Sequence, residues 1–122
     1  MRMARIDHVA FETDDTDDLA AFYGRVLGAR IVKAEGHPVM AYLGNTGLAL
    51  HETGGPGAHT AVRVTEEERA EIRRRLEQEG IEARERDHGV GVGLFFEDPD
   101  GRLIEAITYH GGDDPRRPRS GP

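Results

Sequence analysis

The chain repeats one order of predicted elements, and this repetition constrains its fold more than any other feature. In the first copy, residues 4–53, a strand pattern over 5–11 precedes a helical pattern that Gly28 is placed to end. Turn residues rich in glycine then separate three short strand patterns, at 30–34, 38–43 and 47–52.

The second copy, residues 58–109, has the same order. A strand pattern over 59–64 leads into Thr65-Glu66-Glu67-Glu68, which matches a capping box at the start of a helix. The helical pattern extends to about Glu79, and Gly80 is placed to close it. Strand patterns follow near 81–86, 90–97 and 102–109.

Each copy is therefore a predicted β-α-β-β-β module, and one module alone is too short to bury both its helix and its sheet. We expect an α+β fold in which paired βαβββ modules form a curved, cup-shaped mixed sheet with the helices on its convex side. The whole chain, 1–122, is then a single domain. The tail, 110–122, has the polar, proline-rich composition of a flexible segment.

Charge and residue usage exclude several functional classes. The chain has 23 acidic and 16 basic side chains and a formal net charge of -7, which repels phosphate backbones, so no nucleic-acid partner is expected. The absence of cysteine excludes disulfides, thiolate metal sites and cysteine nucleophiles. No apolar run is long enough for a membrane span or a signal segment, so we expect no membrane partner and a cytoplasmic location.

Three side chains with metal-binding chemistry occupy related positions in the two modules. His8 and His59, 51 positions apart (59 − 8), each lie near the start of the first strand of a module. Glu105 lies between Leu103 and Ile107 on one face of the last strand, where burial of a carboxylate is costly without a partner. Two imidazoles and one carboxylate are common ligands of a reactive divalent cation, so we predict a metal site formed by His8, His59 and Glu105.

These residues and their surroundings resemble the vicinal oxygen chelate superfamily, which includes glyoxalase I, extradiol catechol dioxygenases, fosfomycin-resistance enzymes, methylmalonyl-CoA epimerases and bleomycin-binding proteins. The motifs are His8 in IDHVAF, His59 in AHTAVRV and Glu105 in FFEDPDGRLIEAI, and the resemblance covers about residues 4–109. It implies paired modules, a divalent metal in the cup, a small-molecule substrate and a homodimer.

The subfamilies differ from this chain in ways that affect function. Glyoxalase I and the epimerases usually supply a fourth ligand from the last strand of the first module, where Ala49 or Leu50 aligns here and His51 or Glu52 would align after a register shift. Fosfomycin-resistance enzymes have a serine- and lysine-rich loop where this chain has residues 87–93. Bleomycin-binding relatives usually lack the three ligands altogether.

An open site with three protein ligands favours extradiol-dioxygenase-like chemistry on a substrate with two adjacent oxygens. Fe²⁺ or Mn²⁺ is the favoured ion for that reaction, whereas Ni²⁺ or Zn²⁺ would suit a lyase or isomerase of the glyoxalase or epimerase type. A non-catalytic binding or resistance protein is the third alternative. Proton transfer needs an acid or base, for which the candidates are Tyr109, His51 and Glu52.

The remaining histidines, His37, His88 and His110, are predicted to be loop residues, although His88 could line the mouth of the cup. The alternating glycines beside His88 lack a following helix and so resemble no phosphate loop. They indicate either a flexible flap or a strand that other groups approach closely, and they are Gly89, Gly91 and Gly93.

Overall fold

The computed structural model describes residues 4–118, which form two compact units that correspond to the two predicted modules. Of the described residues, one unit consists of Asp7–Ala58 together with residues 116–118. The other consists of His59–Pro115 together with residues 4–6. The division between the units falls between Ala58 and His59, one residue after the start of the predicted second copy, 58–109.

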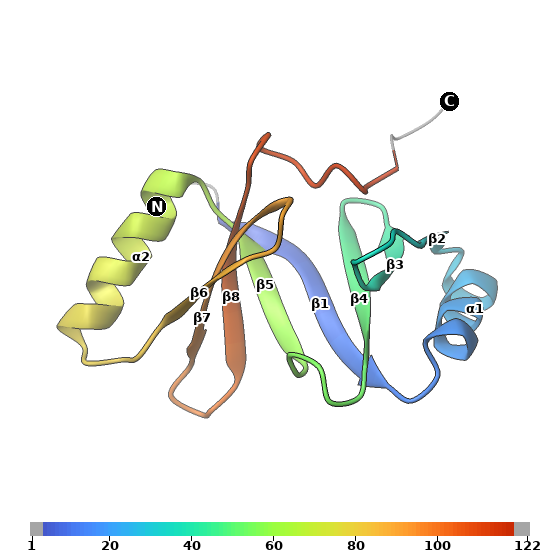
Figure 1. The fold of residues 1–122 in the computed structure, drawn as a ribbon, viewed down its shortest axis with the longest axis horizontal. Coiled ribbons are helices and arrows are strands. Elements are labelled where there is room, and N and C mark those ends of the chain that lie inside the picture. The colour runs from blue at the N-terminus through green and yellow to red at the C-terminus, as the bar shows by residue number, and fades with distance from the viewer. Residues whose placement is uncertain (1–3, 119–122) are drawn as a thin grey trace. The chain divides into compact units, whose positions relative to one another are not determined.

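The unit that contains Asp7–Ala58 has one helix and most of four strands (Figure 1). Its β1 and β4 strands are parallel, while β3 pairs antiparallel with both β2 and β4. The elements are β1 (Arg5–Thr13), α1 (Thr16–Leu27), β2 (Arg30–Val32), β3 (Val39–Leu43) and β4 (Thr46–Glu52).

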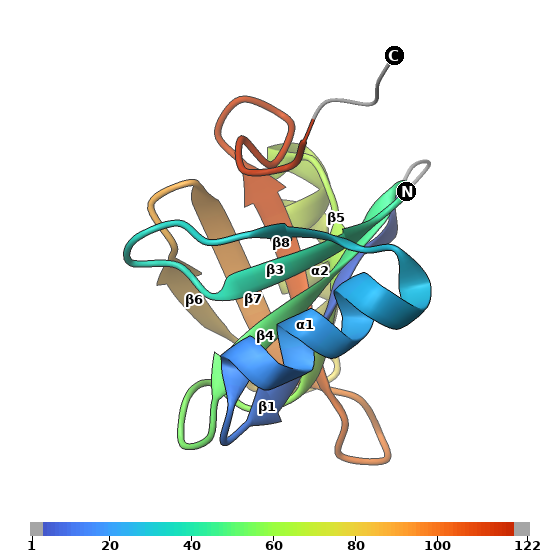
Figure 2. The ribbon, with the colours of Figure 1, turned by 90° about the vertical axis from the view of Figure 1, so that its right-hand side faces the viewer.

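Helix α1 ends at the glycine that its sequence predicts. The Asp15 side chain caps its start by accepting a hydrogen bond from the Asp18 backbone N–H at 3.0 Å. Gly28 ends it in the left-handed conformation, with φ of 68°, which glycine adopts without steric cost. The helix packs against β3 and β4, as Figure 2 shows, and the Phe11 and Tyr23 rings stack with their centroids 6.3 Å apart.

The second unit repeats this arrangement, with β5 parallel to β8 and β7 antiparallel to both β6 and β8. The Thr65 hydroxyl and the Glu68 carboxylate form the predicted capping box at the start of its helix. The elements are β5 (His59–Arg63), α2 (Glu66–Gln78), β6 (Arg84–Asp87), β7 (Gly91–Glu97) and β8 (Leu103–Tyr109).

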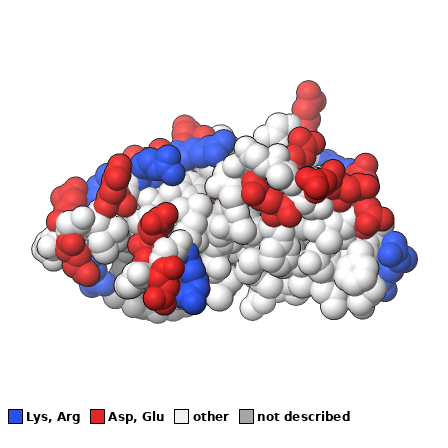
Figure 3. Space-filling view, turned by 90° about the horizontal axis from the view of Figure 1, so that it is seen from below, with Lys and Arg blue, Asp and Glu red and all other residues white. Residues whose placement is uncertain are grey.

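Helix α2 is held to its sheet by a narrow apolar stripe, as expected from its sequence. Leu76 is buried against Leu94 and Ala106, and Ile72 packs at the edge of this cluster. The opposite surface is charged, and Figure 3 shows acidic and basic side chains interspersed at the α2 end of the face it draws. Ion pairs such as Arg73–Glu85, at 3.1 Å, account for this mixture.

The strands pair in the order β2-β3-β4-β1 in one unit and β5-β8-β7-β6 in the other, so each unit has a mixed sheet and the predicted α+β fold of two βαβββ modules is confirmed. The predicted strand bounds are wrong by the most residues at β6, which spans Arg84–Asp87 and not 81–86. The reason is that Ile81 and Ala83 pack against the α2 cluster, and the Ile81 backbone N–H donates to the Leu76 carbonyl at 2.8 Å. Within residues 4–118, no helix is long and apolar enough to cross a membrane.

The turn between β7 and β8 is organised by Asp98. Its carboxylate accepts hydrogen bonds from the backbone N–H groups of Arg102, at 2.8 Å, and Asp100, at 2.9 Å. The bond from Arg102 is the main cause that lowers the pKa of the Asp98 carboxyl. Gly101, with φ of 83°, completes the turn and directs the chain into β8.

Candidate metal centre

Glu105 is the buried carboxylate at the middle of β8. It is 1% exposed, and its neighbours on the same strand face are the apolar residues Leu103 and Ile107. In the sheet it lies opposite Ala61 of β5 and Phe95 of β7. A carboxylate at such a position requires polar partners, as its sequence context predicts.

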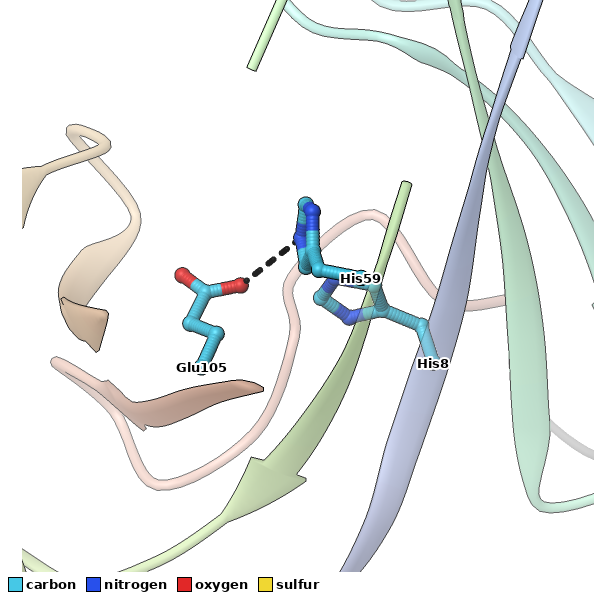
Figure 4. A group of neighbouring side chains, drawn as sticks. All are labelled: His8, His59 and Glu105. Atoms are coloured by element: carbon cyan, nitrogen blue, oxygen red, sulfur yellow. Dashed lines mark ion pairs between the residues drawn. The ribbon is translucent and has the colours of Figure 1, made fainter. Parts of the chain in front are cut away.

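His59 is one of these partners. It is the first residue of β5, is 7% exposed, and places its Nε2 atom 3.3 Å from Oε1 of Glu105 (Figure 4). Two donor atoms bound to one ion at about 2.1 Å, at tetrahedral or octahedral angles, lie roughly 2.9–3.4 Å apart. The spacing and chemistry of this buried pair therefore fit two ligands of one cation.

His88 is a second partner of the same carboxylate, and its Nε2 atom lies 2.6 Å from Oε2 of Glu105. The residue lies in the turn between β6 and β7, as predicted, but the sequence did not identify this contact. Its backbone N–H donates to the Gly91 carbonyl at 2.9 Å, which closes the turn and holds the imidazole in place. The available sequence signal was the histidine's place beside alternating glycines.

Gly93 leaves the space that these side chains occupy. A Cβ atom built at this position would overlap the Glu105 carboxylate and the Nε2 atom of His88. The Phe95 ring completes the surroundings, in edge-to-face contact with both imidazoles at centroid distances of 5.3 Å for His59 and 6.0 Å for His88. Of the two interpretations of the glycines, close approach is the one that Gly93 shows.

His8, the third predicted ligand, lies on β1 in the other unit and is 6% exposed. Its Nδ1 atom lies 2.7 Å from Oδ2 of Asp7, a carboxylate that is itself 2% exposed. The Arg117 guanidinium faces the other oxygen of Asp7 at 3.6 Å, and it is held by the Thr46 carbonyl at 3.2 Å. The sequence analysis did not identify Asp7 or Arg117.

The strand register shows which residues of β4 lie beside His8 in its own unit. Gly47 of β4 lies directly opposite His8, and Ala49 lies opposite Ala10. Neither side chain can bind a metal. His51 lies opposite Glu12, four residues beyond His8, which corresponds to about 13 Å along the strand.

The three predicted acid–base candidates lie in two different places. His51 and Glu52 line a cavity of about 410 Å³ to which His37 also contributes. Tyr109 ends β8 in the other unit and is 3% exposed, with the Arg63 guanidinium 5.3 Å above its ring. None of them is adjacent along its strand to a predicted ligand.

The sequence matches a family model described as the Glyoxalase/Bleomycin resistance protein/Dioxygenase superfamily over residues 5–106. The structure is similar to a superfamily member from Vibrio splendidus 12B01, with 16% identity, a TM-score of 0.64, and coverage of 87% of this chain and 99% of that one.

Two further solved structures carry enzyme names. One is methylmalonyl-CoA epimerase from Mycobacterium tuberculosis, with 23% identity, a TM-score of 0.66, and coverage of 85% of this chain and 87% of that one. The other is the 2,3-dioxygenase LapB from Pseudomonas sp. KL28, with 19% identity, a TM-score of 0.72, and coverage of 86% of this chain but only 40% of that one. At these identities the similarity shows the fold alone.

The close approach at Gly93 generates a stability prediction. Gly93→Ala should lower the free energy of unfolding by about 1–3 kcal/mol, because the added methyl group displaces the Glu105 carboxylate or the His88 ring. Gly111→Ala is the matched control, since a Cβ there meets no atom within 4 Å, and its effect should stay within about 0.5 kcal/mol. Urea unfolding of both variants measures the difference, and equal stability would contradict the described packing.

Proposed function

This chain belongs to the Glyoxalase/Bleomycin resistance protein/Dioxygenase superfamily, and on that premise we propose that it is a divalent-metal-dependent enzyme whose small substrate binds through two adjacent oxygens. The observation that carries the proposal is the buried pair of His59 and Glu105, whose ligand atoms lie 3.3 Å apart. A carboxylate that is 1% exposed has a large desolvation cost, which a cation offsets.

We propose His8 as the third ligand. His8, His59 and Glu105 are all buried, and each offers one ligand atom of a type that holds first-row divalent ions. The two histidines occupy equivalent strands of the two modules. Asp7 binds Nδ1 of His8, as carboxylates do in carboxylate–histidine pairs at other metal sites, and we propose Nε2 as the ligand atom.

An extradiol-type dioxygenase acting on a catechol-like substrate is the reaction that this ligand set favours. Two imidazoles and one carboxylate leave coordination positions for a bidentate substrate and for O₂. When bound, Fe²⁺ or Mn²⁺ would supply Lewis-acid polarisation of the substrate oxygens and electron exchange with O₂. We propose that the acid–base candidates contact the substrate and not the ion, namely Tyr109, His51 and Glu52. Tyr109 lies four residues beyond Glu105 on β8. His51 and Glu52 lie four and five residues beyond Gly47, the residue of β4 that is opposite His8.

A lyase or isomerase with Ni²⁺ or Zn²⁺ is the second candidate, and the fold that the chain shares with the methylmalonyl-CoA epimerase supports it. The ligand set is less favourable, because the strand that usually supplies a fourth ligand has Gly47 and Ala49 at the positions nearest to His8.

The predicted homodimer is retained as a proposal. Helix α1 leaves large apolar side chains on its surface, namely Phe22, Val26 and Leu27, which are 45%, 59% and 52% exposed. Apolar side chains grouped on one helix surface are typical of surfaces that a partner covers.

Metal binding is the first property to measure. Purified chain dialysed against Fe²⁺, Mn²⁺, Ni²⁺ or Zn²⁺ should retain one equivalent of at least one of them. His8→Ala, His59→Ala and Glu105→Gln should each weaken binding by more than about 100-fold, because loss of even an outer hydrogen-bond partner costs about 10–100-fold. His110→Ala, an exposed loop histidine, is the control and should bind as the wild type does. A wild-type chain that retains no ion would favour the non-catalytic binding alternative.

The reaction class is separated by two assays on the metal-loaded chain. Oxygen consumption with a panel of catechols is expected, together with absorbance from the ring-cleavage product, and should disappear in Glu105→Gln. Conversion of a hemithioacetal or epimerisation of a 2-methyl-branched thioester, without oxygen consumption, would instead establish the lyase or isomerase.

A further inference from the structure

We propose that His88 is a positioning residue for the metal ligand Glu105, a role that rests on the proposed function. In this role the Nε2–H group of His88 donates to Oε2 of Glu105 and holds the carboxylate so that Oε1 alone is presented to the ion. The two oxygens already have different neighbours, since Oε2 lies 2.6 Å from His88 and Oε1 lies 3.3 Å from His59.

The two nitrogen–oxygen distances assign different roles to the two histidines. A separation of 2.6 Å is shorter than the roughly 2.9–3.4 Å expected of two ligands on one ion, and it fits a short charge-assisted hydrogen bond. The His59 separation of 3.3 Å lies within the range for two ligands. His88 is also the more exposed of the two, with 26% of its side chain accessible against 4% for His59.

The turn is built to keep His88 in this place. The closing bond from its backbone N–H to Gly91 is supported by the Asp87 carboxylate, which accepts from the Gly89 backbone N–H at 2.7 Å. The missing side chain of Gly93 gives the imidazole its path to Glu105. The Phe95 ring contacts both imidazoles and so restricts both ring orientations.

The hydrogen bond from His88 occupies Oε2 of Glu105. It keeps Glu105 from binding through both oxygens, so the carboxylate occupies one coordination position and not two. A substrate that binds through two adjacent oxygens then has more open positions. His88 would thereby set the number of positions available without contacting the ion.

The test compares His88→Gln with His88→Asn, two amides that differ by one methylene group. The glutamine amide reaches the position of the imidazole Nε2 atom and can donate to Glu105, whereas the asparagine amide is too short. Zinc affinity, measured by competition with a chromophoric chelator, should fall by about 10–100-fold in His88→Asn and by less than about threefold in His88→Gln. His110→Asn is the control for loss of a histidine, and circular dichroism verifies folding.

Any of four results would overturn the proposal while leaving the metal site itself intact. Zinc affinity in His88→Asn equal to that of the wild type would show that the hydrogen bond is irrelevant to affinity. Equal loss in both amide variants, or an imidazole count in X-ray absorption that falls in His88→Gln, would make His88 a ligand. In metal-free protein, ¹⁵N spectra of the imidazoles that show Nε2 of His88 without a proton would exclude the donor role. A wild type that binds no zinc or other ion contradicts the proposed function instead.

Discussion

The burial of one carboxylate organises this protein's candidate site. Glu105 lies in the centre of a strand among apolar neighbours, and its desolvation must be offset by groups that reach it from other strands and turns. His59 does so from the first residue of β5 and His88 from the turn between β6 and β7, one on each oxygen. The absent side chain of Gly93 and the ring of Phe95 make this contact geometrically possible.

Local chemistry was strong enough for the sequence to predict most of the fold. Gly28 marks the end of the first helix, and Thr65 with Glu68 marks the start of the second, because capping depends on residues only a few positions apart. The edge strand β6 was misplaced for the opposite reason. Isoleucine has a high propensity for β-strands, but the packing of Ile81 against α2 keeps this residue outside the strand.

The difference between local sequence signals and tertiary contacts also explains what could be predicted of the site. His59 and Glu105 could be identified as candidate ligands because strand alternation and the module repeat place these polar residues where apolar ones are expected. The sequence did not predict the contact of His88 with Glu105 or that of Asp7 with His8. A turn histidine and a strand aspartate have many possible partners, and only the pairing register and the path of the turn determine which one each meets. Arg117 lies in a segment with tail composition, yet its guanidinium faces Asp7.

Diffraction from crystals of the metal-loaded chain, recorded at the absorption edge of the bound ion, tests the central claim most directly. One anomalous peak within about 2.3 Å of Nε2 of His59, Oε1 of Glu105 and a ring nitrogen of His8 is the predicted result. A loaded chain whose peak lies elsewhere, with Glu105 contacting only imidazoles, would contradict the account.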